Sequence, residues 1–412
     1  MLPPGRRVAP GGARRARGRG VRAVPAPALA RPLSGAGLAW GSARELAAAA
    51  GTPVAAREVP LDAAAGAVLA ADVVARTDLP PADTSAMDGW AVAGPGPWRV
   101  LGELLAGGLA GPLAPGDAVA VATGAWMPAG AEGVLRSEHG LLRDGVLEAL
   151  VPGDPGRDVR RAGRECRAGE VVLPAGSPLT PAAVGLLAAV GADVVGVRRA
   201  AVDVLVLGDE LLTSGTARDG RVRDALGPLL SAWLPALGVR TASRRHVPDR
   251  RDALETALAT CTGDLVVTTG STARGPVDHL HDVLAGLGAR LVVDGVAVRP
   301  GHPQLLALLP DGRPLVGLPG NPLAAATAVL TLVEPVVRGL HALAPQPVRR
   351  VRLGDGVPAG EDATRLVPVR DGRPVLFAGP AMLRGLAVAD GVAVVPPGGA
   401  AAGAEVELLP LP

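Results

Sequence analysis

The sequence predicts a multidomain protein that combines an α/β domain, built on a mostly parallel sheet, with two β-rich units. The chain has 412 residues, which is more than one ordinary hydrophobic core. Residues 201–340 alternate apolar strand-like runs with helical segments, as a parallel sheet covered by helices requires. Residues 98–150 and 348–412 hold short apolar runs separated by Gly and Pro, which predicts a β-rich insertion and a small C-terminal β-barrel or sandwich.

Composition excludes several classes of protein. The chain carries 41 basic and 39 acidic residues, for a net charge of +2, which argues against a dedicated nucleic-acid binder. Cys166 and Cys261 have neither metal-site nor disulfide spacing, so we expect reduced thiols in a cytoplasmic protein. No uninterrupted apolar run reaches the roughly 18 residues of a membrane span, so we expect no membrane segment.

The first part of the chain differs from the rest. Residues 1–32 are rich in Arg, Pro and Gly and lack the apolar core of a secretory signal, so we expect them to be disordered. A short Ala-rich helix is expected from Trp40 to Ala50. A second helix opens at Thr180-Pro181, which fit the N-cap and N1 positions, and closes at Gly191. The domain prediction is a linker and dimerisation unit (33–77 and 151–195), a β-rich subdomain (78–150), an α/β domain (196–342) and a C-terminal β domain (348–412).

The α/β domain is expected to run strand by strand with right-handed crossovers. Its near-continuous apolar strand 201–207 is typical of a doubly covered sheet. The further strands are expected at 239–241, 264–269 and 314–318, and the helices at 225–237, 250–259, 276–287 and 322–340.

The most polar loop lies between residues 78 and 92. Pro80 and Pro81 remove two backbone donors, so this segment is not the interior of a helix or central strand. Hydroxyls and carboxylates then cluster, at Asp83, Thr84, Ser85 and Asp88. The residues alone fit a capped turn as well as they fit a ligand site. A second hydroxyl-bearing turn follows a strand at Thr123-Gly124.

Three loops follow strands of the α/β domain, and ligands of open α/β sheets bind at such strand ends. Gly208-Asp209-Glu210 offers two acids for a divalent cation, although a solvated turn is the simpler interpretation. Gly270-Ser271 and the nearby Asp278 suit an anion held by backbone N–H groups. The segment Gly317-Leu-Pro319-Gly320-Asn321-Pro322 is stronger, because it joins a strand to a helix whose N-terminal N–H groups face any ligand.

Three other polar features have simpler alternatives. The Arg299-Pro-Gly-His302 turn supplies a cation suited to phosphate or oxyanion contact. Asp249 is most simply a helix N-cap. His279 and His281 are two residues apart, face different sides of a helix start, and are expected to be solvated.

Taken in order, these motifs resemble the MoeA-type molybdopterin molybdenumtransferase family, which includes the gephyrin E domain. The resemblance spans about residues 38–412 and rests on six motifs: Ser85-Ala-Met-Asp-Gly-Trp-Ala-Val, Thr123-Gly-Ala, Gly208-Asp-Glu-Leu, Arg299-Pro-Gly, Gly317-Leu-Pro-Gly-Asn-Pro and Met382-Leu-Arg-Gly-Leu-Ala with Ala389-Asp-Gly. It implies a MogA-like α/β domain, a cytoplasmic homodimer, and insertion of molybdate into adenylated molybdopterin with Mg²⁺ present and AMP released. A MogA-type adenylyltransferase is a further implied partner.

The resemblance also implies roles for individual residues. Asp88, Glu210, Asp249 and Asp278 would be catalytic, and the last three would hold Mg²⁺. The substrate-binding set would be Ser85, Thr123, Gly270, Ser271, Arg299, His302, Gly317, Pro319, Gly320, Asn321 and Pro322. The polar loop of residues 78–92 and the Thr123 turn of one subunit would face the sheet domain of the other.

Several positions depart from the family pattern. Arg299 and His302 stand where the family has Lys, and a further family Lys is Gly295. Ala324 and Pro380 stand where it has Ser, which removes hydroxyl donors that an oxyanion would use. Two alternatives therefore stay open: a molybdopterin-binding or scaffold protein without transfer activity, and insertion of a different oxyanion such as tungstate.

Overall fold

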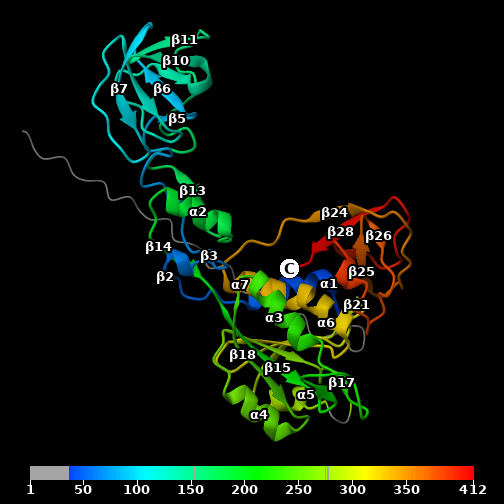
Figure 1. Cartoon of the computed structure of the whole chain (residues 1–412). Helices are drawn as coiled ribbons and strands as arrows, with labels where there is room; N and C mark the ends of the chain where they lie inside the picture. The colour runs from blue at the N-terminus through cyan, green and yellow to red at the C-terminus, as the bar shows by residue number, and fades with distance from the viewer. Residues whose placement is uncertain (1–36, 153, 274, 276–277) are drawn as a thin grey trace, which may run out of the picture.

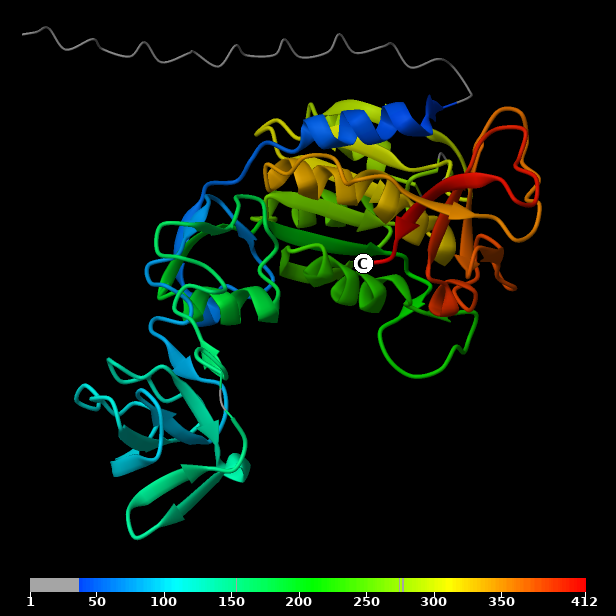
Figure 2. The ribbon, with the colours of Figure 1, turned by 90° about the horizontal axis from the view of Figure 1, so that it is seen from above.

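The structure is a computed structural model that describes residues 37–152, 154–273, 275 and 278–412. The predicted disorder of residues 1–32 lies outside the described residues. The β-rich subdomain stands at one end of an elongated molecule, and a linker unit joins it to the α/β and C-terminal domains (Figures 1 and 2). This separation decides how the predicted site residues are distributed.

The α/β domain is built on a mixed sheet in the order β18-β15-β19-β23-β22-β20. Its strands are β15 (Ala201–Leu207), β18 (Arg240–Val247), β19 (Leu265–Thr269), β20 (Arg290–Asp294), β22 (Leu305–Leu308) and β23 (Pro314–Leu318). The first four in sheet order are parallel, and β22 and β20 add antiparallel partners at one edge. Every residue of β15 is buried, which confirms the predicted doubly covered strand.

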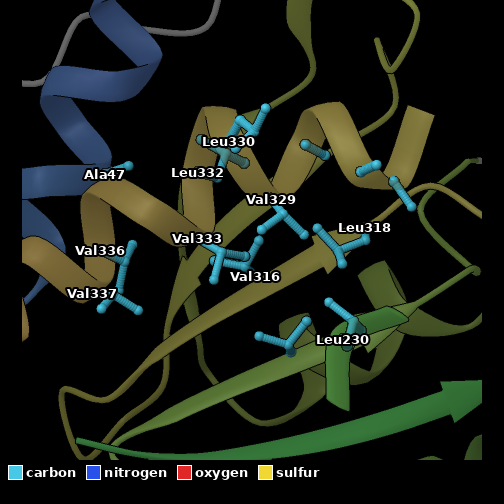
Figure 3. Close-up of a cluster of buried hydrophobic side chains, with 14 of the residues drawn as sticks. Ala47, Leu230, Val316, Leu318, Val329, Leu330, Leu332, Val333, Val336 and Val337 are labelled. Atoms are coloured by element: carbon cyan, nitrogen blue, oxygen red, sulfur yellow. The ribbon is translucent and has the colours of Figure 1, made fainter. Parts of the chain in front are cut away.

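Helices cover both faces of this sheet. One face carries α1 (Trp40–Ala50), α3 (Leu226–Ala236) and the long helix made of α6 (Pro322–Ala328), the π-helical turn Val329–Val333 and α7 (Glu334–Leu340). The other carries α4 (Arg251–Ala259) and α5 (Leu280–Gly286). Figure 3 shows the first layer, where Val316 and Leu318 of β23 meet Leu230 of α3 and Val333 of the long helix.

Helix α1 corrects the predicted domain boundaries, which placed residues 33–77 in the linker unit. Ala43, Ala47 and Ala50 of α1 are buried in the α/β core. The helix approaches α7 so closely that a Cβ on Gly339 would lie 2.4 Å from the Ala48 carbonyl oxygen. The small residues at i, i+4 and i+7 were visible in the sequence, but their partner surface was not.

The segment Pro322–Leu340 is long and apolar enough to cross a membrane by length and composition alone. It is 89% buried inside the described part of the molecule, as the core helix of an α/β domain is. Glu334 and Arg338 interrupt its apolar run, so the sequence shows no uninterrupted apolar stretch of that length here.

The linker unit is a small assembly of short strands and one helix. Its elements are β2 (Arg57–Pro60), β3 (Val68–Leu69), β4 (Val73–Val74), β13 (Val171–Leu173), α2 (Pro181–Ala189) and β14 (Val194–Arg198). Thr180 caps α2 as predicted, because its Oγ1 accepts the N–H of Ala183 at 3.2 Å. Cys166 and Cys261 are both buried and free, as expected.

The β-rich subdomain is confirmed as a separate sheet in the order β10-β11-β7-β8-β6-β9. Its strands are β6 (Gly89–Val92), β7 (Trp98–Leu104), β8 (Asp117–Val121), β9 (Gly133–Arg136), β10 (Gly140–Arg143) and β11 (Val146–Ala149), with β5 (Thr84–Ser85) and β12 (Val159–Arg160) paired beside it. The polar loop between β5 and β6 lies at one end of this sheet.

The C-terminal domain shares its sheet with the α/β domain. The order is β1-β21-β25-β27-β28-β24, with β26 (Arg373–Pro374) on β25. The remaining bounds are β1 (Leu38–Ala39), β21 (Val296–Arg299), β24 (Arg349–Arg352), β25 (Thr364–Arg370), β27 (Gly391–Val395) and β28 (Glu405–Pro410). Strand β21 continues directly from the α/β domain, so backbone hydrogen bonds tie the two domains together.

Candidate active site

A cavity of about 820 Å³ lies at the carboxyl ends of β15, β19 and β23. Because these strands are parallel, their three following loops meet at one edge of the sheet, as predicted. Most of the predicted sheet-domain residues line this cavity: Glu210, Asp249, Gly270, Ser271, Asp278, Pro319, Gly320, Asn321 and Pro322. Arg223, Asp224, Pro303 and Ala381 line it as well and were not predicted as site residues.

The acidic wall of the cavity is held in place by backbone N–H groups. Asp249 accepts the N–H of Asp209 at 3.1 Å, and Asp278 accepts the N–H of Gly275 at 2.7 Å. In each case the bond uses one carboxylate oxygen, and the other makes no hydrogen bond to the residues that the structure describes. The expected N-cap role of Asp249 is wrong, because the N-cap of α4 is Arg250 and no side chain caps this helix.

The acids suit a hard cation whose coordination is completed by a bound substrate. Among the residues that the structure describes, no three His, Cys, Asp or Glu side chains converge closely enough to hold a metal ion by themselves. Glu210, Asp249 and Asp278 nevertheless line one cavity and offer oxygen donors only. Mg²⁺ is usually held by one or two carboxylates, waters and the phosphates of a substrate, so this donor set fits Mg²⁺.

The loop after β19 offers backbone N–H groups from an unusual conformation. Gly270 and Ser271 have φ values of +80° and +58°, and the N–H of Gly270 donates to Leu318 at 2.8 Å. A serine in the left-handed region is uncommon and clusters at functional sites. Successive N–H groups in such a turn form a concave surface suited to an anion.

The loop from Gly317 to Pro322 divides into a packing part and a ligand-facing part. Gly317 is buried in β23, where a Cβ would approach Leu305, Thr272 and Leu280 within 3.0 Å. Core packing therefore accounts for this glycine, and its role in ligand approach stays a prediction. Gly320 is exposed and has open space around it.

The N-terminus of the long helix is not free, contrary to expectation. The N–H groups of Leu323 and Ala324 donate to the Pro380 carbonyl of the C-terminal domain at 2.9 and 3.2 Å. Asn321 occupies the N-cap position, but its side chain makes no capping bond and lines the cavity instead. Ala324 and Pro380, two departures from the family pattern, thus contact each other.

Arg299 lies outside the main cavity, in a second pocket of about 360 Å³ that Arg365 also lines. The two arginines face each other in register across β21 and β25. Arg299 lies four residues before Pro303, which lines the main cavity, so the two pockets are at most about 14 Å apart along the backbone. The anion-binding role of Arg299 stays a prediction, and its side chain lines this second pocket rather than the main cavity.

His302 lines neither pocket, so its predicted contact with the substrate stays a prediction without support from the cavity geometry. Its Nδ1 bonds the Val296 carbonyl at 2.8 Å, and its ring lies over Gly295. A Cβ on Gly295 would approach the His302 ring to 3.3 Å. Two of the three positions that depart from the family's lysines, Gly295 and His302, therefore pack against each other. His281 also differs from expectation, because its Nε2 bonds Asp294 at 2.9 Å and its side chain is mostly buried.

The polar loop of the β-rich subdomain forms a second, distant group. Asp88 is exposed, and its Oδ1 accepts both the N–H (2.6 Å) and the hydroxyl (2.8 Å) of Thr123. These bonds, the backbone one foremost, lower the pKa of Asp88 below its usual value. Ser85 is fully buried and donates its hydroxyl to the Met87 carbonyl, so it shapes the loop, and its contact with substrate stays a prediction.

Asp88 and Thr123 do not meet the sheet cavity within one copy of the chain. Both views place the β-rich subdomain beyond the linker unit, far from the loops that follow β15 and β19 (Figures 1 and 2). Sequence patterns found both groups of residues. The sequence patterns could not show the distance between the two groups, because that distance depends on how the linker unit positions the β-rich subdomain.

Comparisons with known proteins agree with this architecture. Three family profiles match in order: the MoeA N-terminal region (domain I and II) at residues 38–191, the probable molybdopterin binding domain at 203–339 and the MoeA C-terminal region (domain IV) at 350–411. The sequence is 33% identical to the molybdopterin molybdenumtransferase of Synechococcus elongatus, over 71% of this chain and 77% of that one. It is 30% identical to its counterpart in Staphylococcus aureus (strain COL), over 72% and 75%.

The fold comparison leads to the same family. The crystal structure of a molybdopterin biosynthesis MoeA protein from Pyrococcus horikoshii superimposes with a TM-score of 0.68 and 26% identity, covering 90% of this chain and 98% of that chain. The matches span all the described domains rather than the sheet domain alone. The chain belongs to the MoeA family.

Proposed function

We propose that this chain is a molybdopterin molybdenumtransferase of molybdenum cofactor biosynthesis, which takes adenylated molybdopterin, releases AMP and inserts molybdate. The names of its relatives and the family membership support the reaction. The observation that carries the proposal is the cavity itself, in which Glu210, Asp249 and Asp278 line the same space as the turn at Gly270 and Ser271. Acids opposite an anion-binding turn suit a phosphate bound together with a cation.

Each wall of the cavity then has a chemical task. Ser271 would hold the phosphate through its N–H group, because the N–H of Gly270 already donates to the Leu318 carbonyl. Glu210, Asp249 and Asp278 would hold Mg²⁺, which when bound supplies charge neutralisation at the phosphate being cleaved. The carboxylates also orient the attacking oxygen, because each Asp keeps one oxygen free of backbone bonds.

The molybdate contact would move to the second pocket. The helix N–H groups that an oxyanion could use are bonded to Pro380. Arg299 and Arg365 face a pocket next to the turn that leads into the main cavity, and Arg299 has no acidic partner among the described residues. Two guanidinium groups suit a tetrahedral dianion such as molybdate or tungstate.

A second copy of the chain would complete the site. Asp88 and Thr123 form an exposed hydrogen-bonded pair in the β-rich subdomain, which stands apart from the α/β sheet in Figure 1. The proposed assembly is a homodimer in which this pair faces the sheet cavity of the other copy. A MogA-type adenylyltransferase would supply the adenylated substrate, and the free buried cysteines suit a reducing cytoplasm.

The test is turnover by the purified protein. Adenylated molybdopterin, Mg²⁺ and molybdate are expected to give AMP and molybdenum cofactor, and Asp278→Asn is expected to remove both activities. Asp282→Asn is the matched control, because Asp282 is exposed on α5 and does not line the cavity. Absence of AMP release from the wild-type protein would contradict the proposal.

A binding protein without transfer activity is the second candidate. The bonds from Leu323 and Ala324 to Pro380 favour it, because they occupy donors at the oxyanion side. Tight binding of molybdopterin without AMP release, unchanged in Asp278→Asn, would support this candidate. Competition between molybdate and tungstate during insertion separates the two possible oxyanions.

A further inference from the structure

The loop from Val375 to Val388 of the C-terminal domain carries an exposed aromatic ring and reaches the main cavity through another of its residues, Ala381. Phe377 is the chain's only Phe, and the sequence contains no Tyr. Its side chain is 48% exposed. The loop is anchored on the long helix through the Pro380 carbonyl, and the next residue, Ala381, lines the cavity. Phe377 is four residues from Ala381, so it is at most about 14 Å away along the backbone.

The ring is already stacked on a cation. The guanidinium carbon of Arg384 lies 4.5 Å from the centre of the Phe377 ring. Arg384 is exposed and has no ion pair among the described residues, so its charge is not used by an acid. Phe377 also has a φ of +57°, a left-handed conformation that is unusual for a bulky residue and is retained where surrounding structure requires it.

We propose that Phe377 and Arg384 form a stacking platform at the mouth of the cavity, which holds a planar heterocycle of the substrate. The inference rests on the proposed function, because adenylated molybdopterin carries two such rings, the adenine and the pterin. An aromatic ring and a guanidinium plane are the surfaces on which proteins stack bases. The loop that carries the platform also lines, through Ala381, the cavity that Asp249 and Asp278 line.

Two other interpretations of the loop are weaker. An isolated cation–π pair on the surface would need no backbone anchor on the long helix, yet the Pro380 carbonyl of this loop accepts two N–H groups of that helix. A protein-docking patch would use the neighbouring exposed residues Leu376 and Met382 as much as the ring. The experiment below separates the platform from both.

The binding experiment uses AMP and free pterin as separate probes, titrated calorimetrically into the full-length protein. The expected result for Phe377→Leu is an affinity about tenfold lower for one of the two probes, and Phe377→Tyr is expected to restore it. Arg384→Lys keeps the positive charge but removes the planar guanidinium group, so it is expected to lower the affinity for the same probe. Leu376→Ala is the matched control in the same loop and is expected to change neither affinity.

Turnover provides the independent readout. Phe377→Leu is expected to raise KM for adenylated molybdopterin about tenfold while kcat stays close to that of the wild type. Wild-type AMP release with an unchanged KM in Phe377→Leu would overturn the platform and leave the proposed function standing. If the wild-type protein releases no AMP but binds one probe in a way that depends on Phe377, the platform stands and the proposed function is refuted. Equal loss of binding in Leu376→Ala and Phe377→Leu would overturn the platform in favour of a docking patch.

Discussion

Two inactive variants should restore each other if the active site is shared between subunits. Asp88→Asn removes a carboxylate from the β-rich subdomain, and Asp278→Asn removes one from the sheet cavity. These groups stand apart in one copy of the chain (Figures 1 and 2). Each variant alone is expected to lose activity at every site, because each composite site then lacks one carboxylate.

The magnitude follows from the geometry of a twofold dimer. Random mixing in equal amounts makes about half of the dimers mixed, and one of the two sites in each mixed dimer has both carboxylates intact. The mixture is therefore expected to recover about a quarter of the wild-type rate. Within a single copy no such recovery is possible, since every copy carries one defect.

The assay is AMP release after the two variants have been co-expressed or unfolded and refolded together. Asp249→Asn mixed with Asp278→Asn is the control, because both residues line the same cavity and no mixed dimer has an intact site. Circular dichroism checks that each variant is folded. Failure of the first pair to recover activity, or equal recovery by the control pair, would refute the shared site.

Three further predictions concern stability and anion binding. Gly317→Ala is expected to cost roughly 1–3 kcal/mol in denaturant unfolding, because its Cβ would approach Leu305 at 2.9 Å, whereas Gly320→Ala leaves stability nearly unchanged. Burial lowers the pKa of His341 to about 4. As the pH falls from 6.5 to 4, the unfolded state binds a proton that the folded state does not, so the free energy of unfolding falls by at most about 3 kcal/mol. In His341→Gln, the free energies of unfolding measured at pH 7 and pH 5 are expected to differ less than in the wild type. Arg365→Gln is expected to raise the molybdate concentration needed for cofactor formation several-fold without slowing AMP release, and a parallel loss of both would contradict the second pocket.

Local patterns predicted the α/β domain and one half of the site well. The apolar run of β15 and the loops after β15, β19 and β23 are short-range features, and parallel pairing brings strand ends together whatever the remaining packing. That is why Glu210, Gly270 and Asp278 line one cavity as predicted.

Features that depend on contacts between distant segments were missed. The occupied helix N-terminus could not be foreseen, because its acceptor, Pro380, lies in another domain. The inward turn of His302 depends on the open space at Gly295, and the role of Gly317 depends on side chains from two other elements. Residue type alone suggested ligand contact for both, since a histidine or glycine in a polar loop serves packing and binding equally well.

The docking of α1 has a consequence for how the protein is made. Arg44 of this helix pairs with Glu334, 290 positions further along the chain, at 3.0 Å. Synthesis at about 5–20 residues per second leaves α1 without that partner for roughly 15–60 s. During this time the linker unit and the β-rich subdomain emerge and can fold first. The apolar face of α1, formed by Ala43, Ala47 and Ala50, must therefore stay free of other contacts until the last part of the α/β domain leaves the ribosome.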